Sequence, residues 1–215
     1  VNQDPVLTLD GSADYLTASS VPTSGTDDGI ISAWIKTTSS SAQTILASAD
    51  TATANFFIHF RLANGYVYIQ CQDGAGTAIY DIRGGSQIHD GSWHHVAVVS
   101  SGTAISIYVD GVAETLTVDA GSNNGDWFVD MTSSKLDNVT IGVLTHTSNT
   151  YYFNGSIADV RIYNDDLTPD TLIPILASKM QTEHPDTQVS ALQHWWKLNS
   201  ATISTSGVGD DAGNA

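Results

Sequence analysis

The chain has 215 residues, of which seven are Lys or Arg and 23 are Asp or Glu, so its formal net charge at pH 7 is −16. Such an acidic surface repels phosphate backbones and argues against nucleic-acid binding. The hydrophobic fraction of 41% is enough for a core, and no apolar run approaches the ~18–20 residues of a membrane-spanning helix, so we expect a folded domain without membrane insertion.

Strand signals dominate from residue 6 to about residue 163, where short runs of β-branched and aromatic residues alternate with clusters of Gly, Asn, Asp and Ser. Asn64-Gly65 and Asp110-Gly111 separate neighbouring runs, and such dipeptides are typical of β-hairpin turns. Many short antiparallel strands with regular turns predict a sandwich or barrel, and the length fits one such domain. The expected strands include 30–36, 56–62, 66–71, 94–100, 105–110, 139–143 and 156–163.

One short helix is expected near the C-terminus. Thr168 is a suitable N-cap, Pro169 suits the first helical position, and Asp170 interacts favourably with the positive end of the helix. Pro174 follows, and a proline inside a helix costs about 3 kcal/mol. The helix is therefore expected to begin nearer Pro174 or to be preceded by a single turn, and to end near Met180.

The segment after the helix reads as a linker followed by a final strand, which contains the pair Trp195-Trp196. The last residues are small and polar and predict a loop or a frayed tail. The expected organisation is a β-sandwich over residues 1–167, a short helix and linker over 168–187, and a C-terminal strand and tail over 188–215.

Six segments follow one another in the order of a known family. They are residues 9–16 (LDGSADYL), 31–36 (ISAWIK), 90–98 (DGSWHHVAV), 107–111 (IYVDG), 141–142 (IG) and 153–164 (FNGSIADVRIYN). Together they resemble the laminin G-like family of the concanavalin A-like lectin and glucanase superfamily. The resemblance implies an all-β, two-sheet antiparallel jelly-roll sandwich. It says less about the ligand, because this fold hosts lectins, glycan hydrolases and adhesion modules.

The C-terminal segment departs from the family pattern. Family members usually begin with a strand of the Trp-Lys-Leu type, whereas the matching segment here is Trp196-Lys197-Leu198 near the C-terminus. The tail either starts a neighbouring repeat module of the same parent chain, or folds back and completes this sandwich by circular permutation. We favour the second interpretation, because otherwise Trp195, Trp196 and a sheet edge would be left exposed.

The acidic residues lack the pattern of a glycoside hydrolase. Glucanases of this superfamily carry closely spaced acids of the Glu-x-Asp-x-Glu type, and retaining enzymes need two carboxyl groups ~5–5.5 Å apart. Glu114 and Glu183 are the only glutamates and stand far apart in the chain. The Gly-x-Ser-x-Gly pattern of a serine hydrolase does not occur either. We therefore expect no enzymatic activity.

Two further residue types are expected to be structural. His94 and His95 are neighbours on a strand, so they face opposite sides and cannot chelate one metal ion. Cys71 is the single cysteine, which excludes an intrachain disulfide and favours a small apolar filler on a strand.

Calcium is the metal that the resemblance implies, and Asp is a hard oxygen ligand suited to it. In glucanases with this fold, the ligands come from the Asp before Val-Arg-x-Tyr, from the backbone of an early turn and from the end of the first strand. The matching positions here are Asp159, Asp10 with Gly11, and Asn199. The alternative is that Asp159 only hydrogen-bonds the turn that begins at Asp10.

A glycan-binding surface is predicted on the two strands 56–62 and 66–71. Alternate residues of a strand share a face, and one face there combines rings with planar polar groups. Rings stack on sugars, while amides and guanidinium groups bond their hydroxyls. The alternative is an ordinary polar sheet face, with Trp127 packed under its own loop. The candidate ligand-binding residues are His59, Arg61, Tyr66, Tyr68, Gln70 and Trp127, and the loop residues Asn123, Asn124, Asp126, His146, Tyr151 and Tyr152 are candidates for the rim.

These observations favour a non-catalytic, lectin-like carbohydrate-binding module of a larger extracellular, cell-surface or virion protein. The alternative is a structural spacer or protein-adhesion module without a glycan ligand. Because the net charge of −16 repels anions, neutral or cationic saccharides are expected to be preferred over polyanions.

Overall fold

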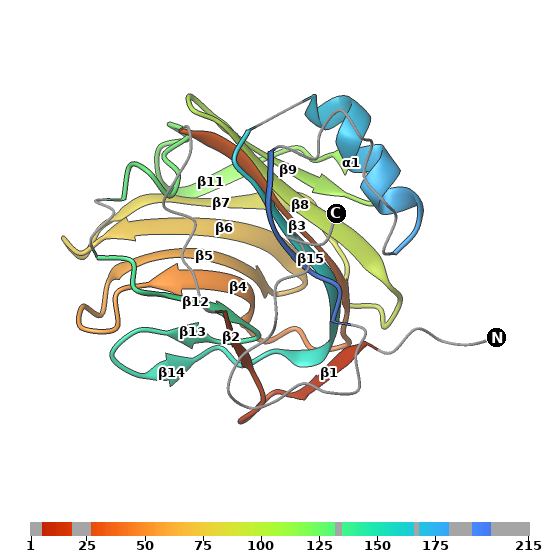
Figure 1. The fold of residues 1–215 in the computed structure, drawn as a ribbon, viewed down its shortest axis with the longest axis horizontal. Helices are drawn as coiled ribbons and strands as arrows, with labels where there is room; N and C mark the ends of the chain where they lie inside the picture. Colours follow the sequence, from red (N-terminus) through yellow and green to blue (C-terminus); the bar gives the residue numbers. More distant parts are fainter. Residues whose placement is uncertain (1–5, 19–26, 132–134, 166–167, 181–190, 199–215) are drawn as a thin grey trace.

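The computed structural model describes residues 6–18, 27–131, 135–165, 168–180 and 191–198. Within these ranges, two seven-stranded antiparallel sheets lie face to face, and one short helix packs outside them (Figure 1). The predicted all-β, two-sheet antiparallel jelly-roll sandwich with one short helix is therefore confirmed. No helix among the described residues is long and apolar enough to cross a membrane.

The first sheet has its strands in the order β1, β15, β3, β8, β9 and β10, with β16 also paired to β15. Their bounds are β1 Leu7–Asp10, β15 Asn154–Tyr163, β3 Asp28–Lys36, β8 His94–Ser101, β9 Ile105–Val109, β10 Val112–Ala113 and β16 Leu192–Trp196.

The second sheet has the order β11, β7, β6, β5, β4, β12 and β2, and a small separate hairpin joins β13 to β14. The bounds are β11 Thr117–Gly121, β7 Ala78–Gln87, β6 Tyr66–Asp73, β5 Phe56–Ala63, β4 Gln43–Ala49, β12 Asn138–Ile141, β2 Leu16–Ala18, β13 Leu144–Thr145 and β14 Asn149–Thr150.

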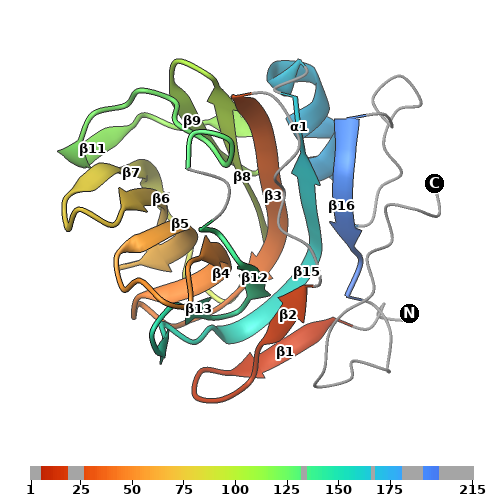
Figure 2. The same ribbon diagram turned by 60° about the vertical axis from the view of Figure 1, so that its left-hand side comes forward.

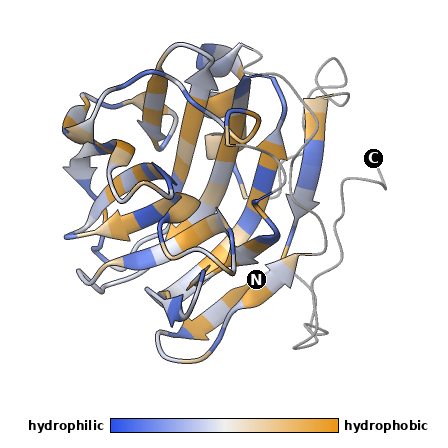
Figure 3. Cartoon of the chain, turned by 90° about the vertical axis from the view of Figure 1, so that its left-hand side faces the viewer, coloured by the Kyte–Doolittle hydropathy of each residue, from blue (hydrophilic) through white to orange (hydrophobic). Residues whose placement is uncertain are grey.

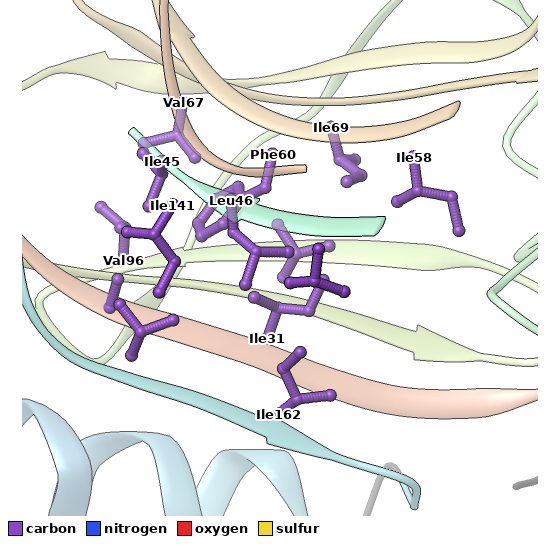
Figure 4. Close-up of a cluster of buried hydrophobic side chains, with 14 of the residues drawn as sticks. Ile31, Ile45, Leu46, Ile58, Phe60, Val67, Ile69, Val96, Ile141 and Ile162 are labelled. Carbon is purple, nitrogen blue, oxygen red and sulfur yellow. The ribbon is translucent and has the colours of Figure 1, made fainter. Parts of the chain in front are cut away.

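The main hydrophobic core fills the space between the two sheets. Figure 3 shows polar and apolar residues alternating along strands, which is the pattern that lets each strand bury one face. In Figure 4, Ile31 and Ile162 of the first sheet point toward Ile58 and Phe60 of the second. Because Ile58 and Phe60 face this core, the intervening residues of β5 face outward.

The outer face of the first sheet is also largely buried, because the helix α1 (Pro169–Ser178) packs on it and residues of the edge strand β16 join the same apolar cluster. Leu172, Ile173 and Leu176 of the helix pack there against Ile30 and other apolar side chains. The outer face of the second sheet carries no such helix among the described residues and is the face on which a binding surface is sought.

The helix begins at Pro169 and continues through Pro174, so the expectation that Pro174 would delay its start or separate a first turn is wrong. The apolar packing of Leu172 and Leu176 offsets the hydrogen bond that the proline removes. Thr168 occupies the N-cap position but its side chain makes no capping bond.

The C-terminal strand belongs to the same sandwich. β1 pairs with the first half of β15, where Leu7 faces Ile157, and β16 pairs with the second half, where Leu192 faces Tyr163. Since β3 lies along the other side of β15, β1 and β16 occupy one edge in succession (Figure 2). β16 is thus an edge strand of the first sheet. Circular permutation of the family's first strand to this position stays a prediction.

A buried ion pair connects β16 to this sheet. Arg161 donates from Nε to Asp159 Oδ1 at 2.9 Å, and the indole Nε1 of Trp195 donates to the same oxygen at 2.6 Å. The Arg161 guanidinium and the Lys197 ammonium each lie 4.2 Å from the centroid of the Trp195 ring. Trp195 is therefore both a core residue and a partner of the buried carboxylate.

Replacing Trp195 by Ala is predicted to lower the free energy of unfolding by about 3–5 kcal/mol, because it removes a buried ring and a donor to Asp159. Denaturant-induced unfolding measures the change. Gln193→Ala, on the same strand and half-buried, serves as the control and is expected to change stability by less than about 1 kcal/mol. Equal effects of the two substitutions would contradict the docking of this strand.

His94 lies between two carboxylates at the end of a hairpin. Its Nδ1 is 2.8 Å from Asp110 Oδ2 and its Nε2 is 3.2 Å from Asp90 Oδ1. Partial burial lowers the pKa of His94, but the hydrogen bonds and charges of Asp110 and Asp90 outweigh it and raise the pKa overall. The neighbouring His95 is buried against Trp34, and burial together with the charge of Arg161 lowers its pKa to about 3.

The contribution of His94 to stability is predicted to depend on pH. Because its pKa is raised in the folded state, the stabilisation is complete below the unfolded pKa of ~6.5 and is lost as the pH rises through the folded value. The difference in unfolding free energy between wild type and His94→Gln should therefore be larger at about pH 5.5 than at about pH 8.5. A difference that grows with pH would refute this assignment.

Candidate functional site

The outer face of the second sheet carries two rows of side chains that run across the strands. The first, which we call the arginine row, consists of register partners on β4, β5, β6, β7 and β11: Thr44, Arg61, Tyr68, Arg83 and Thr117. The second, the glutamine row, consists of register partners on β4 to β7: Ala47, His59, Gln70 and Asp81. Cross-strand register brings residues together here that are far apart in the chain.

Both arginines of the site are paired with a carboxylate. Arg61 donates from Nη2 to Asp81 Oδ1 at 3.0 Å and to Oδ2 at 2.9 Å, and Arg83 lies 3.3 Å from Asp119. Burial raises the pKa of Asp81, Arg61 opposes this, and Asp119 adds to it, so the pKa is raised overall. This network of two cations and two anions carries no net charge.

The two tyrosines are covered by the arginines. The Arg61 guanidinium lies 4.3 Å from the centroid of the Tyr68 ring, and the Arg83 guanidinium lies 4.8 Å from that of Tyr66. The Tyr68 hydroxyl donates to Asp119 Oδ2 at 3.1 Å, and its side chain is only 9% exposed. The prediction of a solvent-facing row of stacking rings is therefore wrong for Tyr68, whereas Tyr66 stays half-exposed.

His59 lies beneath the surface and does not face solvent. It is 1% exposed, and its Nε2 lies 2.8 Å from Thr44 Oγ1. Burial holds the pKa of His59 well below its usual range, with further lowering by the charges of Arg61 and His146. His59 therefore supports the site as a neutral ring and does not offer itself to a ligand.

Gln70 occupies the middle of the glutamine row and is half-exposed. Its amide makes no side-chain hydrogen bond with the described part of the chain, unlike Arg61 and Tyr68 beside it. A primary amide offers both donors and an acceptor, so Gln70 can accept and donate hydrogen bonds to a ligand.

Trp127 does not lie on the outer face of the second sheet. It is 2% exposed, belongs to the main core between the sheets, and packs edge-on against Phe128 at 5.3 Å. The prediction that it rims the outer face is therefore wrong, and the alternative of a ring packed under its own loop is what the structure has. A tryptophan buries too much apolar area to stay exposed when a core lies within reach.

One end of the face is covered by the hairpin β13–β14 and the loop that follows it. The His146 ring stacks on Phe57 at 6.4 Å, and the Tyr151 ring lies 5.6 Å from His59. Leu144 packs on Phe57 in a small separate cluster. The polar part of the face therefore begins at His59 and extends toward β11.

Sequence reasoning missed three residues of the network, namely Asp81, Arg83 and Asp119. The first two alternate in β7 with the buried residues Tyr80 and Ile82. That alternation was a usable signal, because it places Asp81 and Arg83 on the outer face once 78–87 is recognised as a strand. Asp119 lies at a register shift in β11 and had no comparable signal.

Two of the residues expected to bind calcium, Asp10 and Asp159, lie at separate places in the first sheet. Asp10 Oδ1 accepts hydrogen bonds from the backbone N–H groups of Ser12, Ala13 and Asp14. The pKa of Asp10 is lowered, first by the hydrogen bond from the Ser12 hydroxyl and then by these backbone hydrogen bonds. Gly11 is in the same turn at a positive φ of 77°.

Asp10 faces Asn154 at the start of β15, whereas Asp159 lies further along that strand, with its carboxylate bound by the cation Arg161. The Asp159 carboxylate therefore lies away from Asp10 on the strand, and the guanidinium of Arg161 already binds it. No cluster of three or more His, Cys, Asp or Glu suited to a metal occurs among the described residues. Asn199 lies outside them, and calcium binding by this domain stays a prediction.

The pairing of Arg61 with Asp81 is predicted to be energetically coupled, because both side chains are largely buried, with 13% and 16% exposed. A double-mutant cycle of Arg61→Ala and Asp81→Ala should give an interaction free energy of about 1–2 kcal/mol by denaturant unfolding. Additive single-mutant effects would mean that the network does not stabilise the face.

Comparisons with known proteins identify the family and the fold. The family model described as the concanavalin A-like lectin/glucanases superfamily matches residues 10–172. A comparison with curated proteins found no match.

Among solved structures, the chain is similar to the Ruminococcus gnavus IT-sialidase CBM40 bound to α2,3 sialyllactose, at 20% identity and a TM-score of 0.66 over 79% of this chain and 95% of that chain. It is also similar to a native heptameric SAP-like pentraxin from Limulus polyphemus, at 16% identity and a TM-score of 0.59 over 94% of each chain. The LG1-3 region of the laminin alpha2 chain follows with 20% identity and a TM-score of 0.54 over 74% of this chain and 31% of that one. At these identities the likeness is one of fold.

Proposed function

The chain belongs to the concanavalin A-like lectin/glucanases superfamily, and from this premise we propose that it is a non-catalytic carbohydrate-binding module whose ligand lies on the outer face of its second sheet. The match confirms the resemblance indicated by the six sequence segments. In this proposal the module is part of a larger extracellular or surface protein.

The observation that carries the proposal is the convergence of planar polar groups on one sheet face. Gln70 stands half-exposed with its amide unbonded within the described chain, between Arg61 with Tyr68 on one side and Asp81 on the other. The guanidinium of Arg61 and the carboxylate of Asp81 stay partly exposed beside it, at 13% and 16%. Such convergent donors and acceptors are what sugar hydroxyls require, since each hydroxyl both donates and accepts.

The similar R. gnavus module supports a saccharide ligand on this fold, because it was solved with α2,3 sialyllactose and with α2,6 sialyllactose. For a non-catalytic role, the support is the state of the carboxylates on this face. Asp81 is held by Arg61, and Asp119 by Arg83 and Tyr68. A pair of carboxylates held in this way is not free to act as the acid and nucleophile of a glycosidase.

A glycan array followed by titration calorimetry with the bound oligosaccharides tests the proposal. Wild type is expected to bind saccharides with dissociation constants of ~0.1–1 mM. Gln70→Ala should weaken binding about tenfold or more, because it removes an amide that both donates and accepts.

Gln193→Ala, which is also half-buried but lies on β16 of the other sheet, is the matched control and should bind like wild type. If wild type binds no saccharide even at millimolar concentration, the alternative of a structural spacer or protein-adhesion module replaces this proposal.

A further inference from the structure

Tyr151 combines exposure with an unfavourable backbone conformation. Its side chain is 48% exposed, and its φ is +57°. Positive φ is tolerated by Gly and by Asn or Asp, as at Asn64 and Asp110 of this chain, but for a bulky ring it costs free energy. A strained residue that contributes little buried area is a candidate for function and not for stability.

The surroundings of Tyr151 hold it in this conformation. Its carbonyl oxygen accepts the N–H of Thr44 at 2.8 Å. The next two residues are also fixed, since Tyr152 packs edge-on against Tyr15 at 6.2 Å and the N–H of Phe153 donates to Gly142 at 2.9 Å. The loop is therefore anchored on both sides, and the ring projects from a defined position.

That position is at the end of the glutamine row. The Tyr151 ring lies over His59 with its plane tilted by 34° and its centroid 5.6 Å away. His59 is the register partner of Gln70, and Gln70 is that of Asp81. Adjacent strands are ~4.8 Å apart, so Gln70 lies about one strand spacing from the His59 residue over which the Tyr151 ring is placed, a span on the scale of a pyranose ring.

We infer that Tyr151, in place of Tyr66 and Tyr68, is the aromatic platform of the site, on which a neutral pyranose stacks while Gln70 binds its hydroxyls. This rests on the proposed function and names its ligand class. Tyr68 cannot serve, because Arg61 covers its ring and Asp119 holds its hydroxyl. An exposed tyrosine face held in place offers stacking area at little cost in conformational entropy.

The paired charges on this face favour a neutral sugar as the ligand. Each guanidinium already has a carboxylate partner, Asp81 for Arg61 and Asp119 for Arg83. A sialic acid carboxylate would have to compete with those aspartates for the arginines, and the chain's net charge of −16 opposes its approach. This chain is thus expected to differ in ligand class from the fold-related module solved with sialyllactose.

The test uses one array of neutral and sialylated oligosaccharides that includes lactose and α2,3-sialyllactose as a matched pair. Wild type, Tyr151→Gly, Tyr151→Phe and Asn64→Gly are compared on it, and the bound oligosaccharides are then titrated in solution. Asn64→Gly is the matched control, because it also replaces a positive-φ residue by Gly but lies in the β5–β6 turn. Thermal unfolding of each variant is measured alongside.

Tyr151→Gly should remain folded, since Gly accommodates positive φ and this offsets part of the packing that the ring contributes, and should lose at least about tenfold in affinity. Tyr151→Phe and Asn64→Gly should bind within about threefold of wild type, because neither removes the stacking ring.

If a folded Tyr151→Gly protein binds saccharides with wild-type affinity, Tyr151 is not the aromatic platform. Binding of sialylated oligosaccharides in preference to their neutral counterparts overturns the ligand class and leaves the proposed function in place. If wild type binds no saccharide at all, the proposed function is wrong, and this inference, which rests on it, is wrong as well.

Discussion

The whole arrangement depends on one constraint, namely that two sheets must bury one face each against a single shared core. Ile58 and Phe60 of β5 meet Ile31 and Ile162 of the first sheet in that core. Because side chains alternate along a strand, the burial of these residues commits His59 and Arg61 to the opposite face. The position of the candidate site is therefore a consequence of the packing that stabilises the fold.

The two outer faces then take different roles. On that of the first sheet, α1 packs against the strands, and buried polar residues bond one another, as in the ion pair of Asp159 with Arg161 beside Trp195. That of the second sheet is covered only at one end, by the hairpin β13–β14 and its loop. A surface in which polar groups remain partly exposed is the one suited to recognise a polar ligand.

Charge pairing on this face follows from partial burial. A guanidinium that loses most of its hydration needs a carboxylate nearby, and Arg61 and Arg83 obtain theirs from β7 and β11. The result is a locally balanced surface on a strongly acidic chain. In the proposed site, recognition rests on the amide of Gln70 and the exposed face of the Tyr151 ring, which match the hydroxyls and the C–H face of a sugar.

The alternation of apolar and polar residues, together with the turn residues, was enough to predict the sandwich and the common face of Arg61, Tyr68 and Gln70, because strand parity is a local property. The helix after residue 167 was predicted from the residues at its N-terminus, although its course through Pro174 was not. Tertiary structure alone decided which of these side chains stay accessible. Tyr68 is covered and Trp127 is buried in the core, while the carboxylates that pair with the arginines come from strands distant in sequence. Exposure and partners depend on strand register and on the loops that cross a face, and these are set by long-range packing that no local pattern encodes.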